Sequence, residues 1–248
     1  MKKLLLKLRY FLARLKGNNG VSGRVSNETK VDIPKADEKP PVVVIPDQPA
    51  TVGHNLMFYP KAKIIKGMRA AGNYQHGYPQ GAVVHFTAGR DENEQAALDS
   101  LSWGAGENYA FFVIGPTGQV YQSIPLNQWN SHCGQSAWPG LGTKLSNKLV
   151  GIEIACAGKL ENGKAWFGKS YPADQIRNGF KKYTQAQEKA LFELLRWLYE
   201  NNPEVFNCDY ILGHDEISPG RKNDPGHSLS IKMSELRTSV KQNKNPFI

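Results

Sequence analysis

Short apolar runs alternate with amphipathic segments from residue 82 onward, and this order constrains the fold class. Ala82–Phe86 and Leu149–Ala155 have the length and apolar character of buried strands, and Glu92–Leu101 has the pattern of a helix between them. Ala110–Ile114 and Val120–Ile124 are separated by a Pro-Thr-Gly turn, which predicts a hairpin. Strands and helices mixed in this order predict an α/β fold, with a single central mixed β-sheet flanked by α-helices.

The clearest helix signal begins at Thr184. Thr184 and Gln187 have the spacing of a capping box, which satisfies backbone N–H groups at a helix start. The apolar stripe that follows consists of leucines, at Leu191, Leu194, Leu195 and Leu198. Further on, the apolar run Tyr210–Gly213 enters a segment rich in Pro and Gly. We therefore expect His214 where a strand gives way to a loop.

The first sixteen residues contain six basic side chains and no acidic one. At 100° per residue most leucines of this segment fall on one helical face and most cations on the other, which predicts a basic amphipathic helix over residues 1–16. Such a helix suits contact with an anionic membrane or envelope, docking on a carrier particle, or packing on its own domain. Lys7 and Arg9 interrupt the apolar centre and no small-residue cleavage site follows, so we expect no cleavable signal peptide.

Residues 17–50 lack a sustained apolar period and include a proline-rich stretch, which predicts a Pro/Gly/polar linker before a catalytic domain over residues 51–240. No apolar run reaches the roughly 18 residues of a membrane span. The three cysteines are too few and too odd in number for a disulfide framework, which favours free thiols. The formal charge of +9 suggests a polyanionic partner, but no nucleic-acid motif accompanies it.

His85 interrupts the apolar run GAVVHFTAG. A lone histidine there is more often a core residue hydrogen-bonded to the backbone. The segment GHDEISPGRKNDPGH, however, supplies His214 and Asp224, and two imidazoles with one carboxylate suit Zn²⁺ with an open fourth position. Nearby donors of the same types compete for this role, at Asp215, Glu216 and His227.

Several separated motifs together resemble the type-2 N-acetylmuramoyl-L-alanine amidases, a family that includes phage lysozyme-amidases, muropeptide-recycling amidases and peptidoglycan recognition proteins. The motifs are VVHFTAG, FFVIGPTGQVYQ, QWNSHCGQSAW, NKLVGIEIA and GHDEISPGRKNDPG, in the family's order over roughly residues 80 to 230. The sequence departs from the family in two places: the usual tyrosine falls one position away, at Tyr109, and two residues separate Trp129 from His132.

The resemblance implies zinc ligands at His85, His214 and Asp224, and two catalytic groups. Glu153 matches the acid that handles the attacking water, and Lys222 matches the cation beside the reacting carbonyl. Independently, an ionised Glu153 in an apolar strand is costly unless paired, although strand alternation could also turn it outward. Lys222 could equally be a solvated loop lysine. Substrate-binding candidates by the same resemblance are His132, Trp129, Tyr109 and Asn147.

The implied reaction is zinc-dependent hydrolysis of the amide between N-acetylmuramic acid and the L-alanine of peptidoglycan. The basic N-terminus favours a phage endolysin or an antibacterial wall-lytic enzyme, made in the cytoplasm and delivered to the periplasm or cell wall, or carried in a phage-like particle. A cytoplasmic muropeptide-recycling amidase is an alternative. So is a non-catalytic peptidoglycan-binding module, although members of that kind characteristically lack a metal ligand.

Overall fold

The computed structural model describes residues 42–43, 55–66, 68–106 and 111–247. The predicted amphipathic helix over residues 1–16 lies outside the described residues. The predicted linker over residues 17–50 also lies outside the described residues, apart from Val42–Val43, which form the short strand β1. The chain divides into two units, Met1–Lys39 and Pro40–Ile248, and all of the described residues belong to the second.

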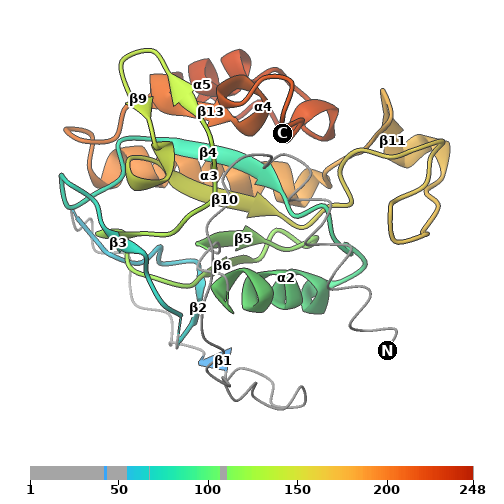
Figure 1. Cartoon of the computed structure of the whole chain (residues 1–248), viewed down its shortest axis with the longest axis horizontal. Coiled ribbons are helices and arrows are strands. Elements are labelled where there is room, and N and C mark those ends of the chain that lie inside the picture. Colours follow the sequence, from blue (N-terminus) through green and yellow to red (C-terminus); the bar gives the residue numbers. More distant parts are fainter. Residues whose placement is uncertain (1–41, 44–54, 67, 107–110, 248) are drawn as a thin grey trace, which may run out of the picture. The chain divides into compact units, whose positions relative to one another are not determined.

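Seven strands form the central sheet, in the order β1-β2-β6-β5-β10-β4-β13 (Figure 1). Beyond β1, their bounds are Lys63–Ile65 (β2), Ala82–Phe86 (β4), Phe112–Ile114 (β5), Val120–Gln122 (β6), Val150–Ile154 (β10) and Ile211–Gly213 (β13). Neighbours from β5 through β13 run parallel, whereas β5 pairs antiparallel with β6 and β1 antiparallel with β2. The sheet is therefore mixed, and the predicted hairpin is confirmed.

Helices cover both faces of this sheet, as predicted. On one face, helix α3 (Gln185–Asn201) buries its leucine stripe together with Leu236 and Val240 of helix α5 (Met233–Gln242). On the other face, Ala97 and Leu101 of helix α2 (Glu94–Gly106) pack over β5 and β6. None of the helices within the described residues is long and apolar enough to cross a membrane.

The start of α3 follows the local sequence signal. The Thr184 hydroxyl accepts the backbone N–H of Gln187 at 3.1 Å, and the Gln187 side chain accepts the backbone N–H of Thr184 at 2.9 Å. Each bond satisfies an N–H group that the helix itself cannot pair, so the predicted capping box is confirmed. The Thr184 hydroxyl also donates to the Pro116 carbonyl, which ties this helix to the turn between β5 and β6.

Three pairs of two-residue strands lie outside the central sheet: β3 (Gly72–Asn73) with β7 (Gln128–Trp129), β8 (Ala137–Trp138) with β9 (Gly142–Thr143), and β11 (Ile176–Arg177) with β12 (Phe180–Lys181). The last pair belongs to an arm that projects at the right of Figure 1. The segment between β7 and β10, by contrast, packs beside β4 and β13 through the core cluster of Val83, Leu145, Leu149 and Leu212.

Candidate metal centre

His85 and Glu153 occupy neighbouring strands at the middle of the sheet. Strands β4 and β10 run parallel with His85 directly opposite Glu153, so the two side chains leave the same face of the sheet. Both residues are buried. The interpretation of Glu153 as an outward-facing strand residue is therefore wrong, because this face is covered by other parts of the chain.

His214 follows strand β13 directly, and Asp224 lies ten residues further on. The structure differs from the expected strand-to-loop transition, because His214 begins a one-turn helix, α4 (His214–Ile217). The Glu216 side chain accepts the Gly213 N–H at 2.9 Å, which favours this turn of helix over a loop. The Asp224 carbonyl accepts the Asp215 N–H at 2.8 Å, so the loop after α4 folds back toward His214.

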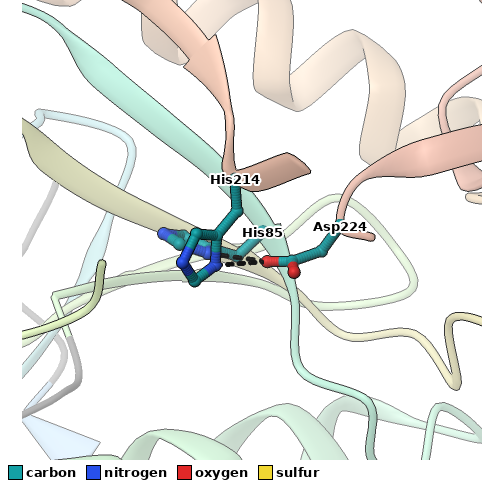
Figure 2. A group of neighbouring side chains, drawn as sticks. All are labelled: His85, His214 and Asp224. Atoms are coloured by element: carbon teal, nitrogen blue, oxygen red, sulfur yellow. Dashed lines mark hydrogen bonds and ion pairs between the residues drawn. The ribbon is translucent and has the colours of Figure 1, made fainter. Parts of the chain in front are cut away.

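Three side chains converge on one point. Figure 2 shows the rings of His85 and His214 turned toward the carboxylate of Asp224. Asp224 Oδ2 lies 2.8 Å from His85 Nδ1 and 2.9 Å from His214 Nδ1. One ligand atom from each residue lies within 4.8 Å of the others, and this is the group of His, Cys, Asp and Glu among the described residues that could hold a metal ion.

Burial and mutual charge shape the electrostatics of this group. Burial lowers the pKa of His214, and the nearby Asp224 charge opposes that shift only in part. For Asp224, burial alone would raise the pKa, but the two neighbouring histidines, His214 most strongly, hold it well below its usual range. The lowered pKa favours the ionised form of this buried carboxylate.

The second ring nitrogen of each histidine has a partner that fixes the tautomer. His214 Nε2 lies 3.0 Å from the Cys133 carbonyl, which can only accept a hydrogen bond, and this partner is closer than the Arg221 guanidinium nitrogen at 3.4 Å. His85 Nε2 lies 3.0 Å from His132 Nδ1, and His132 Nε2 lies 2.9 Å from the Leu149 carbonyl. Neutral rings that satisfy these carbonyls carry their protons on Nε2, so both Nδ1 atoms present lone pairs to Asp224.

Such an arrangement is unfavourable without a cation, because two lone pairs face an anionic oxygen at hydrogen-bonding distance. A metal ion resolves the conflict, since it accepts all three donors. Zinc bonds of about 2.1 Å in tetrahedral geometry separate ligand atoms by about 3.4 Å, which the observed spacing accommodates with small side-chain shifts. The residues present therefore fit a metal ion.

The competing donors named from the sequence are engaged elsewhere. Glu216 pairs with Arg237 through both carboxylate oxygens, at 2.8 and 3.0 Å. Asp215 accepts the backbone N–H of Glu216. The ring of His227 packs edge-on against Phe180 and lies 3.4 Å from the Asn178 amide. Among the ligand candidates, the structure brings together the three that the resemblance implied.

The remaining predicted site residues have different surroundings. Lys222 lies close enough to His214 for its charge to lower the pKa of that ring, although burial and His85 lower it more and Asp224 raises it. Trp129 is half-buried in β7, against the backbone of Gly72. Asn147 ends a short 3-10 helix with its side-chain oxygen buried. Tyr109 lies outside the described residues, and the roles of all four stay predictions.

His132 is buried, and both of its ring nitrogens face protein groups. Its predicted contact with substrate is untested. Neither its contact with His85 nor the contacts of Arg221 were predicted from the sequence. One guanidinium nitrogen of Arg221 lies within hydrogen-bonding distance of the carbonyls of Cys133 and Gln135 and of the Ser218 hydroxyl, at 2.7, 2.6 and 2.6 Å. Arg221 thus joins the loop after β7 to the loop after α4.

The prediction of free thiols is confirmed for all three cysteines. Cys133, Cys156 and Cys208 are buried and form no disulfide. Burial raises the pKa of the Cys133 thiol, and it raises the pKa of Cys156 to about 12. Thiols of this kind are poor nucleophiles at neutral pH, which agrees with their interpretation as structural residues.

The fold and site define the chain as an α/β protein with a buried His-His-Asp group that could hold a metal ion near the carboxyl ends of parallel strands. A sequence profile described as N-acetylmuramoyl-L-alanine amidase matches residues 75–227, a segment that includes His85, Glu153, His214 and Asp224. The chain therefore belongs to the N-acetylmuramoyl-L-alanine amidase family. Among curated protein sequences, none matches it.

Solved structures with a similar fold include several amidases. A selenomethionine derivative of AmpD is 18% identical, with a TM-score of 0.47, over 75% of this chain and 97% of that one. AmiD from E. coli, in complex with anhydro-N-acetylmuramic acid-L-Ala-D-gamma-Glu-L-Lys, is 21% identical, with a TM-score of 0.49, over 68% and 60%. AmpDh3 from Pseudomonas aeruginosa is 22% identical, with a TM-score of 0.47, over 65% and 59%.

Proposed function

We propose that this chain is a zinc-dependent amidase that hydrolyses the bond between the lactyl group of N-acetylmuramic acid and the L-alanine of the peptidoglycan stem peptide. The observation that carries the proposal is the convergence of His85 Nδ1, His214 Nδ1 and one oxygen of Asp224. Membership in the amidase family supports the choice of scissile bond.

The donor set favours zinc over the harder cations. Two imidazole nitrogens and one carboxylate oxygen suit Zn²⁺, whereas Ca²⁺ and Mg²⁺ prefer sites made wholly of oxygen. Three protein ligands leave the fourth tetrahedral position open, which distinguishes a catalytic from a structural zinc site. When bound there, zinc would polarise the amide carbonyl and lower the pKa of water toward about 7.

The protein itself supplies proton transfer and charge stabilisation. Glu153 emerges beside His85, where its carboxylate can take a proton from the attacking water as the new C–O bond forms. The same proton then passes to the departing amine of L-alanine as the C–N bond breaks, which balances the reaction. Lys222, near His214, places a positive charge for the oxyanion of the tetrahedral intermediate.

The setting that best accounts for the sequence is lysis of a bacterial wall by a phage endolysin or antibacterial enzyme. Six cations and no acid in the first sixteen residues favour attraction to an anionic envelope. A cytoplasmic recycling enzyme would have little use for such an extension. Delivery to the periplasm or cell wall, or transport in a phage-like particle, is part of this proposal.

Metal removal tests the proposed zinc dependence. We expect about one zinc per purified chain by elemental analysis, loss of amidase activity on treatment with a chelator, and recovery when Zn²⁺ is restored. His85→Ala should lose the metal, whereas His76→Ala, at an exposed histidine outside the site, should retain it. Full activity in chelator-treated wild-type protein with no detectable zinc would refute the proposal.

A further inference from the structure

On the face of the sheet that carries His85, strand β10 has no side chain at Gly151, two residues before Glu153. Gly151 and Glu153 leave β10 on the same side, and Gly151 pairs with Val83 as Glu153 pairs with His85. The ring of His132 occupies the space that a side chain at position 151 would take. A Cβ added to Gly151 would lie 2.8 Å from His132 Cγ and 3.0 Å from His132 Nδ1, closer than packed atoms approach.

From this position His132 reaches along the sheet to the metal-binding group. Its Nδ1 lies 3.0 Å from His85 Nε2, while its own Nε2 lies 2.9 Å from the Leu149 carbonyl. The Ser146 hydroxyl accepts the His132 backbone N–H at 3.1 Å and so fixes the loop that carries the ring. His132 is thus held at both its backbone and its ring.

The carbonyl of Leu149 sets the direction of this chain of hydrogen bonds. Since it can only accept, His132 carries its proton on Nε2 and presents a bare Nδ1 to His85. His85 Nε2–H then donates to His132, which leaves His85 Nδ1 without a proton. The sulfur of Cys133 also lies 3.1 Å from His132 Nδ1, but burial raises the pKa of this thiol, and an S–H group is the weaker donor.

We propose that His132 is a positioning residue for the metal centre: it accepts the Nε2–H of His85, fixing the tautomer and ring orientation that present His85 Nδ1 to the metal. Gly151 is the residue that admits the His132 ring to this position. The inference rests on the zinc site of the proposed function and extends it to two residues outside the ligand set. Partners of this kind commonly change metal affinity by about 10- to 100-fold.

Zinc affinity, measured by competition with a chelator, is the first test. We expect His132→Ala to weaken zinc binding by about 10- to 100-fold. His132→Asn places an acceptor oxygen where Nδ1 was, so it should bind zinc more tightly than His132→Ala does. His76→Ala, the matched exposed-histidine control, should bind as the wild type does. Far-UV circular dichroism and urea unfolding verify that each variant is folded.

Gly151→Ala tests the same contact without removing any atom of His132. The added methyl group must displace the ring, so we expect weaker zinc binding. If the effect acts through His132, the double variant Gly151→Ala/His132→Ala should bind zinc no more weakly than His132→Ala alone. Additive losses in this cycle would mean that Gly151 acts independently and would overturn its assigned role.

Nitrogen chemical shifts give a readout that does not depend on activity. Long-range ¹⁵N–¹H spectra of the wild-type holoenzyme should show His132 protonated at Nε2 and bare at Nδ1, and His85 protonated at Nε2. The opposite tautomer at His132, wild-type zinc affinity in folded His132→Ala, or equal losses in the Ala and Asn variants would each overturn the positioning role. No zinc affinity in the wild type would overturn the proposed function as well, which separates the two failures.

Discussion

Glu153 lies opposite His85 in adjacent parallel strands, so that a carboxylate and the imidazole of a proposed metal ligand leave the same face of the sheet side by side. Neighbouring strands are separated by about 4.8 Å, which allows both side chains to reach one substrate atom. This relationship comes from the register of β4 and β10 rather than from any loop. The centre of the sheet would therefore position the proposed base, Glu153, relative to the proposed metal.

Replacement of Glu153 by Gln should separate metal binding from catalysis. The amide has nearly the same shape but cannot take a proton from water, so we expect zinc content to be retained and kcat to fall by about 10²- to 10⁴-fold. Elemental analysis and release of stem peptide from purified sacculi measure the two quantities on the same sample.

Glu161→Gln is the matched control, because Glu161 is an exposed carboxylate outside the metal-binding group. It should leave both zinc content and turnover at wild-type values. If zinc-loaded Glu153→Gln released stem peptide as fast as this control, Glu153 would not be the base.

Local sequence patterns were sufficient to predict the strand that carries His85 and the start of helix α3. The apolar run Ala82–Phe86 has no helical period, and it is β4 at the predicted bounds. Thr184 and Gln187 are three residues apart, so their capping box depends on no distant contact. The chemistry of His85, His214 and Asp224 could be proposed because His85 lies in one motif and the other two residues share a second one, GHDEISPGRKNDPG.

Features that depend on distant contacts could not be predicted in this way. His132 and His85 are 47 residues apart in sequence. Their contact also requires that Gly151, on a third segment, has no side chain to displace the His132 ring. Val42–Val43 form a strand only because Ile64 and Ile65 of β2 pair with them. The helical turn at His214 depends on the Glu216 side chain, which Arg237 of α5 also holds.

The pH dependence of stability should carry a contribution from Glu188. Burial raises the pKa of this carboxyl, although hydrogen bonds from Ser230 oppose the shift. The folded protein therefore binds this proton more tightly than the unfolded chain, and stability falls as pH rises from about 4.5 through the raised folded value. Glu188→Gln keeps an acceptor for the Ser230 N–H, which lies 2.6 Å from the Glu188 carboxylate.

Urea unfolding of the wild type and Glu188→Gln at several pH values tests this contribution. The variant should have the larger free energy of unfolding at pH 7, and the two proteins should converge near pH 4. Ionised Asp224, whose pKa is lowered, affects both proteins alike and cancels in the difference. A difference that stays constant between pH 4 and pH 7 would contradict the assignment to Glu188.

Removal of residues 1–20 should separate wall hydrolysis from access to the wall. The variant retains every proposed site residue, so we expect unchanged release of stem peptide from purified sacculi. Lysis of intact cells should weaken, because the positive charge that attracts the chain to an anionic envelope is lost. Equal lysis of intact cells by the full-length and shortened chains would argue against envelope contact by this segment.

The mass of the product released from purified sacculi tests the central claim most directly. Hydrolysis of the proposed bond gives stem peptides with a free L-alanine amino group and leaves intact glycan strands that carry lactyl carboxylates. Mass spectrometry after digestion with the zinc-loaded full-length chain should detect these peptides, and the Glu153→Gln protein should release them about 10²- to 10⁴-fold more slowly. Products cut within the peptide or the glycan, or no product from zinc-loaded protein, would contradict the account.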